Sequence, residues 1–244
     1  MSLAIDRLAQ SSRWRRRSTT EKAVLALGLL ALALALPPWP GAVLVLLVSW
    51  TAALAGARIG WRDWLRLVAA PLGFALTGAA ALAVEISPDG LALARDGGAA
   101  ALSVILRAAA ALSCLLLLAV TTPAPDLVRG ARRLGLSPEI AEMALLIWRF
   151  LFLLLDSAIA IRHAQEARLG WHGFRRSIRS LGLLVALLLP RALDRARRLE
   201  HGLAARGFDG SLPMLSPRQP LSIHFIAVAL GLQAAVLGIA LWWI

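Results

Sequence analysis

The 244-residue chain is 59% hydrophobic, carries a formal net charge of +12 and has a mean hydropathy of +0.72. A strongly basic chain could bind nucleic acid, but its arginines alternate with apolar runs that are too long for the core of a soluble domain. Its one cysteine, Cys114, excludes an internal disulfide and a cysteine-rich metal site, and its place in an apolar run predicts a small buried side chain. The composition therefore indicates an integral membrane protein.

The N-terminal half predicts a series of membrane spans, each of which needs roughly 20 apolar residues. After a basic N-terminal segment comes a short apolar run, Ala23–Leu36, which we interpret as a retained span because no small-residue cleavage pattern follows it. The proline-rich turn Pro37–Pro40 leads into a second span, Gly41–Ala57, so the two form a helical hairpin. Further spans are predicted at Leu67–Ile86 and Ala99–Val120.

The segment Thr121–Pro220 is more polar and predicts amphipathic helices at the inner face of the membrane. Ser137 is a typical helix cap with proline in the first turn, and the helix that it begins is expected to run to Arg168. A proline precedes a strongly basic helix, Arg191–Arg206, and either begins or kinks it. The apolar stretch Met143–Leu155 leaves open whether this part of the chain enters the bilayer.

A last apolar run, Leu221–Ile244, completes a prediction of about five spans. Arginines gather in the loop before the third span and in the polar segment, whereas the loops on the other side carry little positive charge. Because cytoplasmic loops are enriched in Lys and Arg, this pattern predicts a cytoplasmic N-terminus and an external C-terminus. We therefore expect an all-α membrane protein in three parts: residues 1–120 with four transmembrane helices, the cytoplasmic or interfacial helices of residues 121–220, and the C-terminal span of residues 221–244.

Two segments of the polar region share the pattern His-x-x-x-Ala-Arg followed by a glycine and an aromatic residue. The first begins at His163 and the second at His201, and the first contains one extra residue, Leu169, before its glycine. Small residues at such a helix end allow close approach to a partner, and the arginine can form a bidentate pair with a partner carboxylate. The residues assigned to this contact are Ala167, Arg168, Gly170, Ala205, Arg206 and Gly207.

The same pattern also has a purely structural explanation. An arginine in the last turn of a helix, followed by glycine, is ordinary C-terminal capping that the helix dipole favours. Ala-Arg pairs also occur elsewhere in the chain, so a single match does not distinguish docking from capping. From the spacing alone, capping is the better explanation. The repetition of the pattern and its place at the edge of a membrane, together with the family resemblance described below, favour docking.

Charged residues and histidines elsewhere in the chain give weaker indications of a functional site. Arg107 lies inside a predicted span and either extends to the outer surface or pairs with Glu85 near the end of the preceding span. Arg149 and Asp156 share one helical face, which indicates contacts with neighbouring helices more than a substrate path. The histidines are not spaced with acidic residues or the cysteine as metal ligands are, so no metal site is predicted.

No catalytic constellation is evident, because the sequence contains neither a Gly-x-Ser-x-Gly elbow nor a His-Glu-x-x-His helix. A phosphate-binding P-loop needs a glycine-lysine pair followed by serine or threonine. Lys22 is the only lysine and is followed by Ala23, so this chain is not a Walker-type ATPase. If the chain works in an ATP-driven machine, the nucleotide site is on another subunit.

These features resemble the transmembrane T component of energy-coupling factor (ECF) transporters, and look most like its cobalt-type CbiQ members. The resemblance covers nearly the whole chain and rests on the N-terminal IDRLAQSSRWRRRSTTEK, the long helical polar region and the two Ala-Arg motifs. Ala205-Arg206-Gly207 matches the family's Ala-Arg-Gly, whereas the first motif departs from it with Leu169 in place of glycine.

The resemblance implies a nonenzymatic coupling subunit of an ATP-driven importer in a bacterial or archaeal cell membrane. Family T components join two ABC-type ATPase subunits to a membrane-embedded substrate-binding subunit, and their motif-bearing helix ends enter grooves on the ATPases. Carried over to this chain, Arg168 and Arg206 each pair with an acidic residue of one ATPase. ATP and magnesium would then bind to the ATPases and cobalt to the substrate-binding subunit, with no cofactor on this chain.

Other functions are compatible with the residues alone. The same coupling role could serve nickel, biotin or another vitamin, because the partner subunit sets the specificity. A different class is an inner-face membrane enzyme acting on lipid headgroups, which the basic helices favour and the missing catalytic residues oppose. A third is a membrane-bound interaction protein without a transport role.

Overall fold

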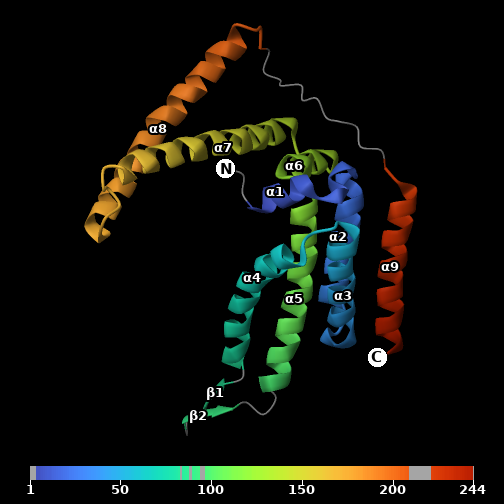
Figure 1. The fold of residues 1–244 in the computed structure, drawn as a ribbon. Coiled ribbons are helices and arrows are strands. Elements are labelled where there is room, and N and C mark those ends of the chain that lie inside the picture. Colours follow the sequence, from blue (N-terminus) through green and yellow to red (C-terminus); the bar gives the residue numbers. More distant parts are fainter. Residues whose placement is uncertain (1–3, 83, 88–89, 94–96, 209–220, 244) are drawn as a thin grey trace. The chain divides into compact units, whose positions relative to one another are not determined.

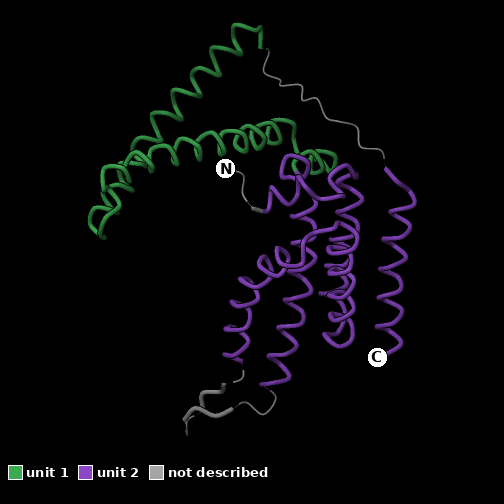
Figure 2. Tube along the Cα trace, in the orientation of Figure 1, with its two compact units in different colours: residues 1–3, 128–217 green, residues 4–127, 218–244 purple. Residues whose placement is uncertain are grey.

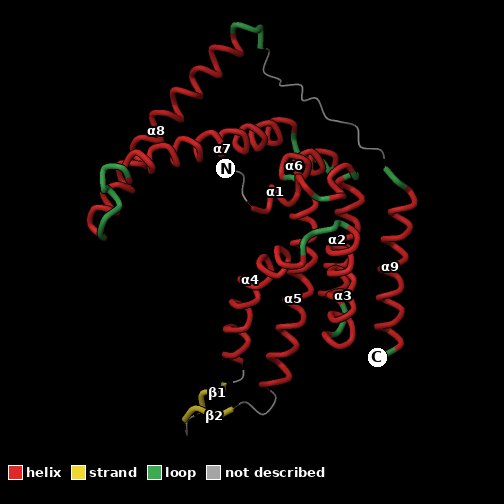
Figure 3. Tube along the Cα trace, in the orientation of Figure 1, coloured by secondary structure: helices red, strands yellow, loops and turns green. Residues whose placement is uncertain are grey.

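The computed structural model describes residues 4–82, 84–87, 90–93, 97–208 and 221–243. They form helices and one short β-hairpin, so the predicted helical membrane fold is confirmed and the hairpin is an addition to it (Figures 1 and 3). The chain divides into two compact units, drawn in separate colours in Figure 2. The larger unit takes in the described residues of 4–127 and 221–243, and the smaller one those of 128–208.

The larger unit is a helical bundle. Its elements in chain order are α1 (Ala4–Ser11), a 3-10 turn (Arg13–Arg16), α2 (Thr19–Ala35), a π-type turn (Pro38–Ala42), α3 (Val43–Thr51), a second π-type turn (Ala52–Gly56), α4 (Trp61–Leu82), strands β1 (Val84–Ser87) and β2 (Gly90–Leu93), α5 (Gly97–Thr121), the start of α6 (Ala124–Arg133), and α9 (Ile223–Trp242). The strands pair antiparallel, with Val84 opposite Leu93 and Ser87 opposite Gly90.

The core of this bundle lies around α5, which packs against α2, α3 and α4, while α9 packs against α2. Trp64 of α4 is fully buried and lies edge-on to Trp50, whose indole nitrogen donates a hydrogen bond to the Ser113 hydroxyl at 3.2 Å. Cys114 is fully buried, as predicted. Small side chains bring the helices close together, as is usual within membranes. The fully buried alanines are Ala33, Ala42, Ala53, Ala57, Ala110 and Ala240.

Within the described residues, five helical segments are long and apolar enough to cross a membrane. They are Pro38–Gly56, Trp61–Leu82, Gly97–Thr121, Pro138–Glu166 and Ile223–Trp242. The first, third and fifth confirm predicted spans to within a few residues. The predicted span Leu67–Ile86 is wrong at both ends, because α4 already begins at Trp61 and the chain leaves the helix after Leu82 to enter β1.

Two further differences from the prediction concern α2 and α7. The predicted short span Ala23–Leu36 lies in α2, which has 17 residues and is shorter than the five segments above. In contrast, α7 (Pro138–Glu166) contains the apolar stretch Met143–Leu155 and has the length and composition of a span. These are properties of the helices themselves and assign no side of the membrane to either one.

Buried charged side chains hold helix ends together in the larger unit. Lys22 is only 2% exposed, and its ammonium donates a hydrogen bond to the Thr121 carbonyl at the end of α5, at 2.8 Å. The neighbouring Glu21 is 1% exposed and accepts a hydrogen bond from the Ser222 backbone N–H, just before α9, at 2.5 Å. Arg17 lies 3.7 Å from the second carboxylate oxygen of Glu21. The start of α2 is therefore joined to the end of α5 and to the start of α9.

The smaller unit consists mainly of two long helices, α7 and α8 (Phe174–Ala204), which a tight turn connects (Figure 3). The Ser137 hydroxyl accepts a hydrogen bond from the Ile140 N–H at 3.4 Å, which confirms the predicted cap of α7. Of the two alternatives for Pro190, the start of a separate basic helix Arg191–Arg206 is wrong, because α8 runs continuously through this proline. A proline removes one donor and bends a helix without having to end it.

Candidate docking site

The first Ala-Arg motif forms the C-terminal cap of α7. Leu169 has a left-handed φ of 55°, and its N–H donates to the Glu166 carbonyl at 2.9 Å. The next N–H, of Gly170, donates to the Gln165 carbonyl at 2.8 Å. This pair of hydrogen bonds around one left-handed residue is the Schellman cap, which satisfies carbonyls that the ending helix would leave without donors.

The second motif forms the same cap at the end of α8. Gly207 has a φ of 70°, and its N–H donates to the Ala204 carbonyl at 3.1 Å. The N–H of Phe208 donates to the Leu203 carbonyl, also at 3.1 Å. Arg206 directly precedes the left-handed residue, as Arg168 does in the first motif.

The two caps correct one part of the sequence interpretation. Counted from the hydrogen bonds, Leu169 is the counterpart of Gly207, and Gly170 is the counterpart of Phe208. Leu169 is therefore no extra residue, and the departure of the first motif from Ala-Arg-Gly leaves its backbone geometry intact. What differs is the residue type in the left-handed position, which glycine adopts without strain and leucine rarely adopts.

Both arginines are available to a partner. The side chains of Arg168 and Arg206 are exposed, and within the described residues neither has a hydrogen-bond or ion-pair partner. Ala167 and Ala205, which precede them, are exposed as well. Each motif thus presents a guanidinium beside a small residue at a helix end, as the docking interpretation requires.

The first helix end is rigidly held by the turn between α7 and α8. The Ser180 hydroxyl donates to the Gly170 carbonyl at 2.8 Å, and the Gln165 amide donates to the Ser180 carbonyl at 3.0 Å. Gln165 also accepts a hydrogen bond from the Trp171 indole at 3.2 Å. The Arg162 guanidinium lies over the Trp171 ring, 5.2 Å from its centre. Hydrogen bonds therefore tie the end of α7 directly to the first turns of α8.

Among the described residues, no comparable hydrogen bonds from another helix hold the second helix end, and none of their atoms lies within 4 Å of the place that a Cβ on Gly207 would take. The two motifs lie at opposite ends of α8, whose 31 residues correspond to a length of about 45 Å. The two motifs are therefore separate sites on the chain, too far apart to belong to one small binding site.

The structure tests other sequence-predicted residues only in part. Arg107 donates a hydrogen bond to the Leu36 carbonyl at 3.2 Å, a partner that the sequence did not suggest. Its predicted partner Glu85 lies in β1, and the Glu85 side chain is outside the described residues, so that pairing stays a prediction. Among the described residues, no group of three His, Cys, Asp or Glu side chains is placed to hold a metal ion.

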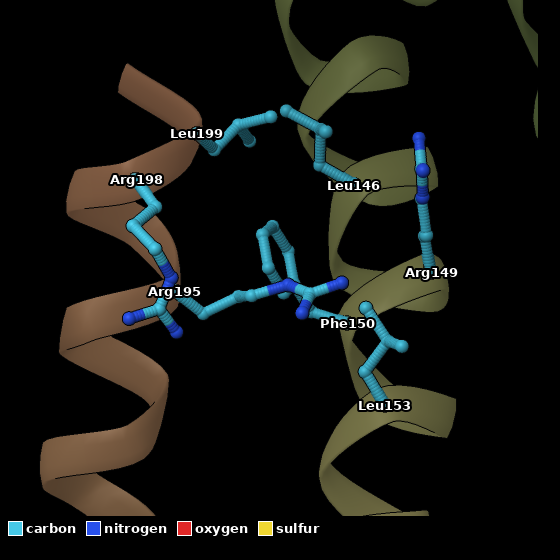
Figure 4. Close-up of a pocket in the computed structure, with 7 residues that line it drawn as sticks. All are labelled: Leu146, Arg149, Phe150, Leu153, Arg195, Arg198 and Leu199. Atoms are coloured by element: carbon cyan, nitrogen blue, oxygen red, sulfur yellow. The ribbon is translucent and has the colours of Figure 1, made fainter. Parts of the chain in front are cut away.

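Sequence reasoning missed a basic groove between α7 and α8. Arg149 and Asp156, singled out on α7, line this groove together with arginines of α8. Figure 4 shows Arg149 of α7 with Arg195 and Arg198 of α8. Arg191, Arg195 and Arg198 recur at the spacing of one helical face, and this spacing was the signal available in the sequence.

Helices of spanning length, close packing at buried alanines and exposed basic helix ends define a multi-pass membrane protein. The sequence model of the family described as cobalt transport protein (CbiQ) matches residues 11–217. The chain therefore belongs to the CbiQ cobalt transport protein family.

Individual relatives agree with this membership. The chain is 50% identical over 239 residues to the "Cobalt transport protein CbiQ" of Rhodobacter capsulatus, a match that covers 98% of each chain. It is 32% identical over 219 residues to the protein of the same name from Salmonella typhimurium, covering 84% of this chain and 97% of the relative. A "Putative fused cobalt transport protein CbiMQ" of Methanocorpusculum labreanum is 25% identical over 203 residues, or 75% of this chain and 34% of the relative.

Proposed function

We propose that this chain is the energy-coupling transmembrane subunit of an ATP-driven ECF-type importer for cobalt ions. It joins two ABC-type ATPase subunits to a membrane-embedded substrate-binding subunit and catalyses no reaction itself. The observation that carries the proposal is the pair of identical helix caps, each with an exposed arginine at the same backbone position. Two equivalent ends on one chain suit two copies of one partner surface.

In this role each exposed arginine pairs with an acidic side chain in a groove of one ATPase. A guanidinium presents donors in a planar fork that matches a carboxylate, so the pair fixes direction as well as distance. Ala167 and Ala205 leave room for the groove wall beside Arg168 and Arg206. The chain's single lysine stands outside any P-loop, so ATP and magnesium bind to the partners.

Cobalt is the proposed substrate because relatives from two organisms carry that word in their names. The substrate-binding subunit as a direct neighbour is supported by the fused relative, of which this chain covers only 34%. With both motifs on the ATPase side, the polar region is cytoplasmic and α9 takes the C-terminus outside. The N-terminus is then inside, with α2 crossing the membrane as well as the three candidate spans that follow it. These proposals place the protein in a bacterial or archaeal cell membrane.

Co-purification tests the docking role. The tagged chain is expressed with its neighbouring transport subunits, extracted in mild detergent, and the bound proteins are identified by mass spectrometry while ATP hydrolysis is measured. We expect the wild type to retain P-loop ATPases and the Arg168→Glu/Arg206→Glu variant to lose most of them, because each reversed charge repels a carboxylate. Arg175→Glu/Arg176→Glu, with the same change of charge near the α7–α8 turn, is the matched control and should retain them.

Equal retention by the wild type and the motif variant would show that the arginines are only caps. Uptake by the reconstituted complex then tests the substrate. ATP-dependent accumulation of cobalt supports the proposal, whereas uptake of nickel or a vitamin without uptake of cobalt would overturn that part of it.

A further inference from the structure

The groove between α7 and α8 consists of two adjoining cavities that lie away from both Ala-Arg motifs. They share Phe150 and Leu153 of α7 and Arg195 and Arg198 of α8. Figure 4 shows the Arg195 side chain extending from α8 toward α7, beside the Phe150 ring. The other residues that line the two cavities are Leu146, Arg149, Leu154, Asp156, Ser157, Ala160, Arg191 and Leu199.

The lining combines positive charge with an apolar wall. Arginines outnumber the one carboxylate, that of Asp156, so the groove as a whole favours an anion. Guanidinium groups recognise phosphate oxygens through paired, charge-assisted hydrogen bonds. The same groove presents leucine side chains and the Phe150 ring, which a free inorganic anion would leave uncovered.

The outer faces of both helices are also apolar next to this groove. On α7, Met143 and Ile147 are 61% and 65% exposed, and on α8, Leu189 and Leu193 are 63% and 51% exposed. Such surfaces are covered by lipid chains or by a protein partner. An anionic phospholipid satisfies the arginines and the apolar wall with one molecule, and it is always present around a multi-pass membrane protein.

We propose that the α7–α8 groove binds an anionic phospholipid. The phosphate lies against Arg195 and Arg198, and an acyl chain lies along Phe150 and the leucines of α7. The bound lipid neutralises the facing arginines and fills the space between the two helices. This inference is independent of the proposed coupling function, because it concerns a groove of this chain alone.

Lipid binding by the purified full-length chain tests the proposal. The chain in detergent is titrated with phosphatidylglycerol, with phosphatidylcholine and with glycerol 3-phosphate, and the bound molecules are counted by native mass spectrometry. We expect phosphatidylglycerol to bind at least about tenfold more tightly than either of the others, since losing one good charged contact or the apolar contact costs a factor of this order.

Two pairs of substitutions separate the groove from general charge. Arg195→Gln/Arg198→Gln should weaken phosphatidylglycerol binding about tenfold or more, as expected for the loss of charge-assisted hydrogen bonds. Arg175→Gln/Arg176→Gln removes the same charge from α8 outside the groove. This pair should change the affinity for phosphatidylglycerol by less than about twofold. The single variant Arg195→Gln, with an intermediate loss, serves if the double variant does not remain monodisperse.

Several outcomes would overturn the proposal. Equal losses in the two pairs would mean that only overall charge matters. Equal binding of glycerol 3-phosphate would identify an anion site without a lipid requirement. Equal binding of phosphatidylcholine, whose phosphate is balanced by a choline cation, would show that the groove does not select an anionic lipid. Unchanged lipid binding together with loss of a transport subunit from the Arg195→Gln/Arg198→Gln complex would assign the groove to a protein partner.

Discussion

Single residues decide how closely the helices of this protein approach one another, and Gly170 shows this at the α7–α8 turn. A Cβ on Gly170 would lie 2.8 Å from the Ser180 hydroxyl oxygen and 2.9 Å from the Gln165 carbonyl oxygen. Both atoms take part in the hydrogen bonds that hold the turn. The turn thus has room for a glycine and for no larger side chain.

Gly170→Ala is therefore expected to lower the free energy of unfolding by about 1–3 kcal/mol, the usual cost of an overpacked contact. The measurement is the midpoint of thermal unfolding of the full chain in detergent. Gly182→Ala in α8 is the control, because nothing lies within 4 Å of its Cβ position. It should be neutral or slightly stabilising, since alanine is the better helix former. Similar midpoints for the two variants would contradict the tight turn.

Gly28 and Gln233 form a comparable contact between α2 and α9. The Gln233 amide donates to the Val24 carbonyl at 2.8 Å, in the space that a side chain at Gly28 would need. Gly28→Ala should turn the amide away and cost about 1 kcal/mol, in the range of hydrogen bonds between membrane helices. The free energies of unfolding of Gly28→Ala, Gln233→Ala and the double variant measure the interaction energy between the two positions. Additive effects of the two changes would argue against a shared contact.

At the scale of helices, Lys22 connects α2 to the end of α5. The Lys22→Met substitution keeps much of the side-chain volume but removes the donor that reaches the Thr121 carbonyl. We expect a loss of about 1.5–3 kcal/mol of unfolding free energy, because hydrogen bonds to charged groups contribute this much. Thermal unfolding checks it, with Arg66→Met as control: Arg66 is 79% exposed and lies 3.8 Å from Asp63. A control as unstable as Lys22→Met would contradict the buried link.

The sequence predicts some of the helix positions and ends better than others. The well-predicted ones depend on interactions between residues that are close in the sequence. Most spans were predicted because length and hydropathy are local properties, and the Ser137 cap because its hydrogen bond closes within one turn. The end of the span at Leu82 was missed because the residues that follow it form β1, whose hydrogen bonds are with the separate strand β2. The sequence left open whether a new helix begins at Pro190, because a proline removes one backbone hydrogen bond and can either end a helix or bend it.

The candidate docking residues show the same division. The Ala-Arg ends were found because a helix cap forms between residues that are close in the sequence. Their common register was missed because Leu169 takes a left-handed conformation that sequence reasoning reserves for glycine. The α7–α8 groove was missed because its arginines and leucines come together only when two helices pack.

For the whole molecule, the number of crossings sets the side on which each helix end emerges. The proposed function requires both motifs in the cytoplasm, although α7 has the composition of a span. In a Cys114→Ser background, Arg15→Cys, Arg175→Cys and Glu200→Cys should resist a membrane-impermeant maleimide in intact cells and react after lysis. A cysteine added after Ile244 should react in intact cells. Labelling of Arg175→Cys from outside would mean that α7 crosses the bilayer and would overturn the proposed topology.

Because α8 is one continuous helix, it connects the two motif-bearing ends mechanically. The helix is about 45 Å long. It is weakened at Pro190, which has no backbone N–H to donate within the helix. Hydrogen bonds to the α7 end hold the first turns of α8, whereas no described atom lies within 4 Å of a Cβ position on Gly207 at the other end. In the proposed coupling role, any bending at Pro190 would reduce the displacement that passes from one end of α8 to the other, so the stiffness of the helix around this one proline would limit how much movement α8 transmits.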